Sequence, residues 1–97
     1  MKVLAIGTIV KELTPAQRDE IMPQEVPATL KLYLDGKIEQ NWFRHDKPGV
    51  VFLMNSESVD EAKATLDTLP LAAEGLLAFD LMPVGPLAPL GMLLQGK

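Results

Sequence analysis

The sequence predicts an α+β fold of the ferredoxin-like type, in which two helices cover one face of a four-stranded antiparallel sheet. One observation indicates this fold, and a second indicates that it forms a single domain. The predicted elements follow the order strand, helix, strand, strand, helix, strand, which is the split βαβ pattern. The chain has 97 residues, of which 47% are hydrophobic and 23% are charged. Residues 1–97 therefore fit a single globular domain.

The first third of the chain predicts a strand followed by a long helix. Val3–Val10 is rich in valine and isoleucine without polar alternation, which favours a strand that is covered on both faces or nearly so. Thr14, Pro15 and Gln17 supply a cap, a proline at the first helical position and a capping-box glutamine. Asp35–Gly36 is a typical helix end. Apolar residues at helical spacing predict one stripe on this helix: Met22, Val26, Leu30, Tyr33 and Leu34.

Residues 37–55 predict an antiparallel hairpin. Asp46–Gly49 is a turn sequence, and Val50–Met54 is the second strand of the pair. Regular alternation divides the side chains of the first strand between two faces. One face would hold Ile38, Gln40, Trp42 and Arg44, and the other Glu39, Asn41, Phe43 and His45.

The rest of the chain predicts a second helix, a last strand and a tail. Caps in Asn55–Ser58 precede an amphipathic helix that begins at Val59 and ends at Pro70, and Leu76–Met82 is the last strand. The apolar, proline-rich tail, residues 83–97, is expected to pack on a partner subunit. The sheet face without helices needs a cover, which favours a homodimer or a higher homo-oligomer.

Composition excludes several classes of function. The formal charge of -4 and the lack of any lysine and arginine run argue against a nucleic-acid partner. The apolar stretch Leu76–Leu94 contains Asp80 and three prolines, so no membrane span is expected. With one histidine and no cysteine, a metal site is not expected, and the cysteine-free chain suits the reducing cytoplasm.

The stretch Ile21–Pro27, IMPQEVP, places two prolines inside the predicted first helix. Each proline costs about 3 kcal/mol relative to alanine, because it removes a backbone donor and clashes with the preceding turn. The carbonyls of Asp19 and Pro23 would lose their helical donors, which predicts a local opening for a ligand, water or side chain. Glu25 lies between the two prolines. If partly desolvated, its carboxylate suits a general base; otherwise it is a solvent-facing glutamate.

Three stretches of the chain share a pattern with a known family. They are Pro15 with Gly36 and Trp42, the helix Ser58–Leu71 with its Ser-Val opening and Leu-Pro-Leu close, and the last strand with Pro83 and the Leu87 region. Together they resemble the muconolactone isomerase family. The resemblance implies a dimeric α/β barrel, and a proton shift within an unsaturated lactone that carries a carboxylate, catalysed without metal or organic cofactor.

The resemblance also bears on the site. A helix glutamate of the family matches Glu25. The family's second strand carries a basic cluster, roughly Trp-Arg-His-Leu-Trp-Arg, whereas Ile38–Phe43 of this chain retains only Trp42 and has an acid in place of an arginine. The expected function is thus a cofactor-free isomerase-type proton transfer on an unsaturated lactone or related cyclic compound.

Five residues are candidates for this site. Glu25 would be the base and His45 the acid, Arg44 would hold an anionic substrate, and Trp42 and Tyr33 would line the pocket. His45 also suits an ordinary exposed turn, and both aromatic residues suit simple packing.

Two other functions stay open. One is a non-catalytic oligomeric ligand-binding or stress-response barrel, which the missing basic cluster favours. The other is a cofactor-independent monooxygenase, suggested by Asn41, Trp42 and analogy of fold.

Overall fold

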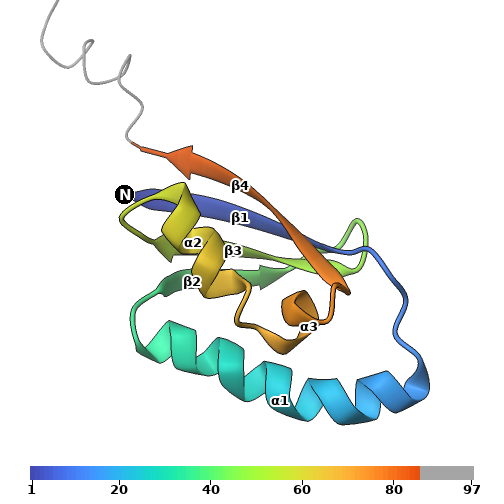
Figure 1. Ribbon diagram of the computed structural model, residues 1–97. Helices are drawn as coiled ribbons and strands as arrows, with labels where there is room; N and C mark the ends of the chain where they lie inside the picture. The colour runs from blue at the N-terminus through green and yellow to red at the C-terminus, as the bar shows by residue number, and fades with distance from the viewer. Residues whose placement is uncertain (86–97) are drawn as a thin grey trace, which may run out of the picture.

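The computed structural model describes residues 1–85 and shows a four-stranded antiparallel sheet with all helices on one face (Figure 1). The elements are β1 (Lys2–Ile9), α1 (Pro15–Leu34), β2 (Ile38–Phe43), β3 (Gly49–Asn55), α2 (Val59–Leu66), α3 (Pro70–Ala73) and β4 (Leu77–Val84). The strand order is β2-β3-β1-β4. The predicted ferredoxin-like fold is confirmed. The expected packing of the tail falls largely on residues 86–97, which lie outside the described residues.

The central strand β1 is covered on one face only, whereas its sequence predicted cover on both faces or nearly so. Val3 and Ala5 face the helices and are completely buried. Leu4 and Ile6, between and after them, point to the other face and are half-buried. Apolar residues of the neighbouring strands continue this open face: Val51, Leu53, Trp42 and Met82. The open face is therefore apolar, and none of the elements described covers it.

Helix α1 begins and ends as its sequence predicts. Thr14 and Gln17 form the capping box, and Gly36 takes a φ of +80°, the left-handed conformation that ends a helix most easily in glycine. Pro23 and Pro27 lie within a continuous helix. Both are exposed, since they lie about half a turn around the helix from buried Glu25. The backbone N–H groups that the two prolines lack would have lain on the solvent side of the helix. Water can therefore hydrogen-bond to the carbonyls left free one turn earlier.

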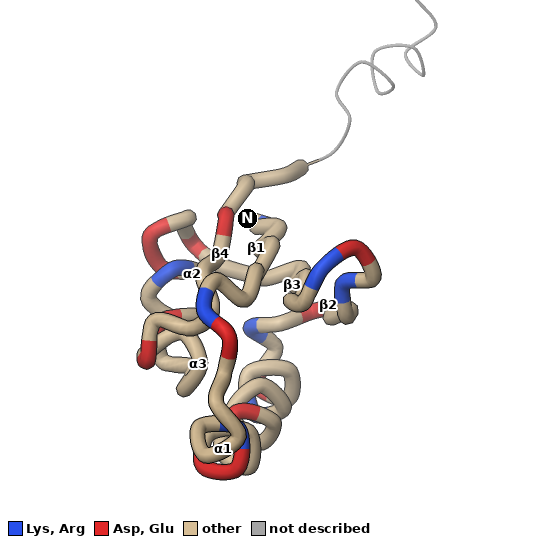
Figure 2. The backbone as a smooth tube through the Cα atoms, turned by 90° about the vertical axis from the view of Figure 1, so that its right-hand side faces the viewer, with Lys and Arg blue, Asp and Glu red and all other residues tan. Residues whose placement is uncertain are grey.

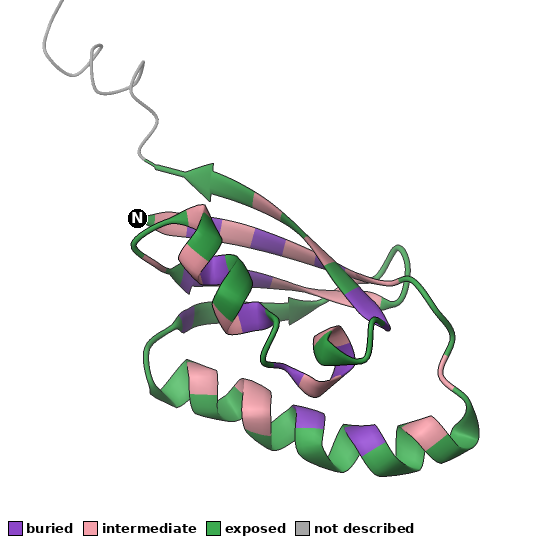
Figure 3. Cartoon of the chain, viewed as in Figure 1, coloured by how far each residue is buried: buried purple, intermediate pink, exposed green. Residues whose placement is uncertain are grey.

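The apolar stripe predicted on α1 does not form the core. Its members are 36 to 73% exposed: Met22, Val26, Leu30, Tyr33 and Leu34. The buried positions of the helix are instead Ile21 and Glu25 (Figure 3). Helical spacing correctly grouped the stripe on one side of α1, but that side borders an open groove.

A β-bulge changes the faces of β2. Ile38 pairs with Met54, but Gln40 already pairs with Leu53, so Glu39 is an extra residue in the edge strand. Ile38 is 1% exposed and belongs to the core, opposite in direction to Gln40. Asn41 pairs with Phe52 and therefore faces the helices. The prediction that Ile38 shares a face with Gln40 and Trp42 was wrong, because alternation fails at a bulge.

The second predicted helix is two helices. Helix α2 ends at Leu66, and Pro70 begins α3 rather than ending α2. Proline is favoured at the first helical position because its missing N–H is not needed there. The buried residues of α2, Ala62 and Leu66, join the main core of β1 and β3, whereas Leu71 of α3 joins a smaller cluster with Ile21 of α1.

The charges of the described chain are dispersed. Figure 2 shows lysine and arginine scattered over several elements instead of gathered on one face. Among residues 1–85, none of the helices is long and apolar enough to cross a membrane.

Candidate functional site

A groove of about 840 Å³ lies between α1 and the β2–β3 end of the sheet. One side of α1 forms the first wall, with Met22, Val26 and Leu30. The helix-facing side of the sheet forms the second wall, with Phe43 and Phe52. Most of the lining is apolar, and the volume falls within the range of small-molecule sites. The groove is thus the candidate site of the described chain.

Glu25 is the buried ionisable residue of this groove. Its carboxylate is held from two sides: Oε1 accepts a hydrogen bond of 2.9 Å from the backbone N–H of Leu71, and Oε2 lies 3.4 Å from the Thr29 hydroxyl. Leu71 lies in the first turn of α3, whose cap residue, Leu69, has no side chain that can accept a hydrogen bond. Glu25 therefore both supports α3 and presents a fixed carboxylate to the groove.

Burial raises the pKa of the Glu25 carboxyl above its ordinary value of 4.5. The hydrogen bonds from Leu71 and Thr29 offset part of this rise, since they stabilise the charged form. The residue is only 7% exposed. A carboxylate with a raised pKa is a stronger base, which suits proton abstraction near neutral pH.

Other polar groups reach the groove from both walls. Thr29 and Tyr33 contribute hydroxyls from α1, and Asn41 contributes an amide from β2. Arg18 lines the groove from the first half of α1, and it is the cationic side chain among the described lining residues. Seven residues, about 10 Å of helix, separate Arg18 from Glu25.

Arg18 was not among the site residues predicted from the sequence. Its spacing from Glu25, seven residues or two helical turns, is the signal that places both on one side of α1. Asn41 was predicted only as a residue of a monooxygenase, because the sequence does not reveal the bulge that turns it toward the helices.

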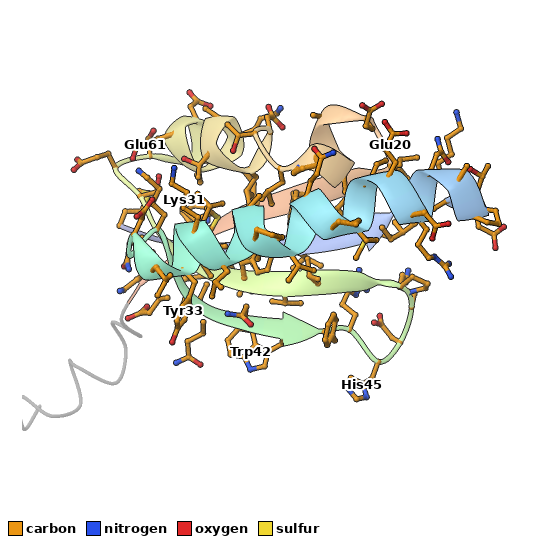
Figure 4. The ribbon with its side chains drawn as sticks, turned by 90° about the horizontal axis from the view of Figure 1, so that it is seen from below. Glu20, Lys31, Tyr33, Trp42, His45 and Glu61 are labelled. Atoms are coloured by element: carbon orange, nitrogen blue, oxygen red, sulfur yellow. The ribbon has the colours of Figure 1, made fainter. Side chains whose placement is uncertain are left out.

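Three predicted site residues meet at the groove: Glu25, Tyr33 and Trp42. Figure 4 shows Tyr33 near the end of α1 and Trp42 on the neighbouring edge strand. Trp42 is 48% exposed and pairs with Val51, so it borders the groove while facing the open side of the sheet.

Arg44 lies apart from this group. Its guanidinium donates 2.9 and 2.6 Å hydrogen bonds to the carboxylate of Asp46 and a 2.7 Å hydrogen bond to the hydroxyl of Thr8. Thr8 belongs to the open face of the sheet, opposite the helices. The guanidinium lowers the pKa of Asp46 to about 2, chiefly through the hydrogen bonds. These contacts fasten the β2–β3 turn to β1.

His45 lies on the exposed turn after β2 and points away from the helices in Figure 4. It is not among the residues that line the groove. The structure thus separates it from Glu25. In residues 1–85, no group of three or more histidine, acidic or cysteine side chains could hold a metal ion.

The fold is similar to two solved structures. Muconolactone isomerase matches with a TM-score of 0.75 and 17% sequence identity, over 89% of this chain and 90% of the other. The 5-chloro-2-hydroxyhydroquinone dehydrochlorinase of Burkholderia phenoliruptrix AC1100, in complex with 2,5-dihydroxybenzoquinone, matches with a TM-score of 0.68 and 18% identity, over 88% and 94% of the two chains. No protein-family model and no curated protein sequence matches the chain. The predicted resemblance to the muconolactone isomerase family is confirmed at the level of fold.

Proposed function

We propose that the protein is a cofactor-free enzyme that moves a proton within an unsaturated lactone or related cyclic compound. The observation that supports this proposal most is Glu25, a nearly buried carboxylate with a raised pKa in a mainly apolar groove. Groups of this kind serve as general bases because burial raises their pKa toward neutrality.

Glu25 alone supplies both halves of such a proton shift. Leu71 holds Oε1, so Oε2 is the oxygen with capacity to accept a proton from a substrate carbon. The carboxyl formed in this way then returns the proton to another carbon of the same substrate. This scheme needs no second acid, which fits the position of His45 outside the groove.

The character of the groove favours an enzyme over a non-catalytic binding protein. A barrel that had lost its chemistry would have a cleft filled by apolar side chains, without converging polar groups. Instead the cleft is open, and Glu25 and Arg18 both line it. The two structures of similar fold, an isomerase and a dehydrochlorinase, support a reaction on a small cyclic molecule.

The test is the Glu25→Gln variant, assayed against unsaturated lactones with and without a carboxylate substituent. We expect turnover to fall by roughly 10²- to 10⁴-fold, since the amide cannot accept the proton. Glu20→Gln is the matched control, because Glu20 is an exposed glutamate of the same helix. Equal turnover by both variants would remove Glu25 from the mechanism, and a wild-type protein inactive on every lactone would contradict the proposed reaction.

We further propose that the protein acts as a homodimer in the cytoplasm. The apolar open face, with half-buried Leu4, Ile6 and Leu53, gives a second copy a surface to cover, and the absence of cysteine suits a reducing compartment. Light scattering of wild type and of Leu53→Lys would test the dimer. A dimer that persists in the variant would place the interface elsewhere.

A further inference from the structure

Asn41 stands on the wall of the groove that faces α1. The bulge at Glu39 shifts the register of β2, so Asn41 pairs with Phe52 and shares its face of the sheet. Phe52 is 3% exposed and lies beneath the helices. Asn41 itself is exposed and lines the groove. An amide is thus presented to a mainly apolar space at a position where regular alternation would have directed it to the face away from Ile38.

Asn41 and Glu25 line the same groove from opposite walls. Helix α1 and strand β2 run antiparallel through the turn at Gly36 (Figure 1). Glu25 lies on α1 and Asn41 on the helix-facing side of β2, and both line the groove. A flat molecule in the groove would therefore meet the carboxylate from one wall and the amide from the other.

The Asn41 amide has donors to offer. In the described part of the chain its side chain makes no hydrogen bond with protein, whereas Glu25 is held by Leu71 and Thr29. The amide is also neutral. A cation beside Glu25 would lower the pKa of the base, but an amide can stabilise a negative oxygen without that effect.

We propose that Asn41 is a catalytic residue that donates a hydrogen bond to the carbonyl oxygen of the substrate. The group that carries this oxygen is a neutral carbonyl, not a carboxylate. This inference rests on the proposed proton-transfer function. Among the described lining residues the cation, Arg18, is two helical turns from Glu25 and not beside it, so the space between Glu25 and Asn41 suits a neutral carbonyl better than a carboxylate. The substrate class is an uncharged cyclic carbonyl compound such as a simple unsaturated lactone.

The proton and electron pair are both accounted for in this scheme. Glu25 takes a proton from the carbon next to the carbonyl; that C–H bond breaks and an O–H bond forms on the carboxyl. The electron pair moves into the ring and gives a dienolate, whose charge rests on the oxygen that Asn41 contacts. The Glu25 carboxyl then returns the proton to the far carbon of the conjugated system. The product is the conjugated lactone, and no outside reactant takes part.

The experiment measures conversion of α-angelica lactone, an uncharged unsaturated lactone, to its conjugated isomer. We expect Asn41→Leu to lower kcat roughly 100-fold with little change in KM, because the hydrogen bond strengthens only as the enolate forms. Asn41→Ser, which keeps a donor, should recover part of the loss. Gln40→Leu is the matched control: it removes a neighbouring exposed amide of the same strand that pairs with Leu53 and faces away from the groove.

Each outcome decides the proposal. Turnover by Asn41→Leu equal to that of Gln40→Leu would overturn the role of Asn41 and leave the proposed function intact. If the wild-type protein does not convert the lactone, 4-nitrophenolate, a planar oxyanion, serves as the probe. If Asn41→Leu weakens this binding at least about tenfold and Gln40→Leu does not, Asn41 is upheld as the residue that binds the oxygen atom of the substrate. Absent binding, or equal loss in both variants, would overturn it. Thermal melting of each variant confirms folding.

Discussion

Helices α1 and α2 cover the same face of the sheet in different ways. Ala62 and Leu66 of α2 are 0 and 1% exposed and meet the core directly. Helix α1 has 20 residues, against 8 in α2, yet its buried residues are Ile21 and the acid Glu25. Its apolar stripe remains exposed at the groove (Figure 3). One half of the covered face is thus closed around apolar residues, and the other half is open around a carboxylate. The α2 side therefore holds the closed apolar core, and the α1 side holds the candidate site.

The largest expected effect on stability is on the α2 side. Leu66→Ala removes a side chain that is 1% exposed and leaves a cavity in the main core. We expect the free energy of unfolding to fall by about 2 to 5 kcal/mol. Leu30→Ala on α1 is the matched change, because Leu30 is 53% exposed at the groove, and it should cost about 1 kcal/mol or less. Urea unfolding measures both, and equal losses would contradict the division between the two sides.

A smaller effect is the pH dependence that Glu25 gives to stability. Because burial raises its pKa above 4.5, the folded protein binds this proton more tightly than the unfolded chain does. The resulting stability is fully present below pH 4.5 and is lost as the pH rises through the raised pKa of the folded protein. Relative to Glu25→Gln, the wild-type protein should therefore become less stable as the pH rises through this window. Unfolding curves of the two proteins that stay parallel from about pH 4 to about pH 8 would show that Glu25 does not titrate in this way.

The smallest effect is expected at the turn between β2 and β3, away from both sides of the comparison. Arg44 lowers the pKa of Asp46 to about 2, so the stability gained from this pair is present above the ordinary value of 3.8 and is lost as the pH falls through about 2. Asp46→Asn should remove this dependence. Turnover of lactones should not change, because Arg44 contacts Thr8 on the open face. A loss of turnover would bring Arg44 back into the site.

Much of the fold could be predicted from the sequence because its signals are local. Thr14 and Gln17 marked the start of α1, Gly36 its end, and the order of elements gave the topology. Pro70 was misassigned as a helix end, since a proline is equally suited to stop one helix and to start the next. That ambiguity hid α3, and with it the backbone N–H that holds Glu25.

The site was less predictable, because it depends on what lies opposite each residue. The spacing of Met22, Val26 and Leu30 shows that they share a side of α1 but not whether anything covers that side. Glu25 was selected because it lies between two prolines and matches a family glutamate, and its burial became visible only through Leu71, which is distant in sequence. His45 and Arg44 were grouped with it because they are chemically suited, although the turn places them elsewhere.

The bulge at Glu39 makes one residue of the edge strand a spacer rather than part of the groove wall. A bulge adds a residue to one strand that has no partner of its own on the other. Loss of Glu39 would leave Gln40, Asn41 and Trp42 paired with Leu53, Phe52 and Val51, because the deletion removes the extra residue together with the bulge. Asn41 would therefore keep its place on the helix-facing wall of the groove. A single-codon deletion at this position in a descendant of this protein would thus shorten the edge strand and leave the side chains of the groove unchanged.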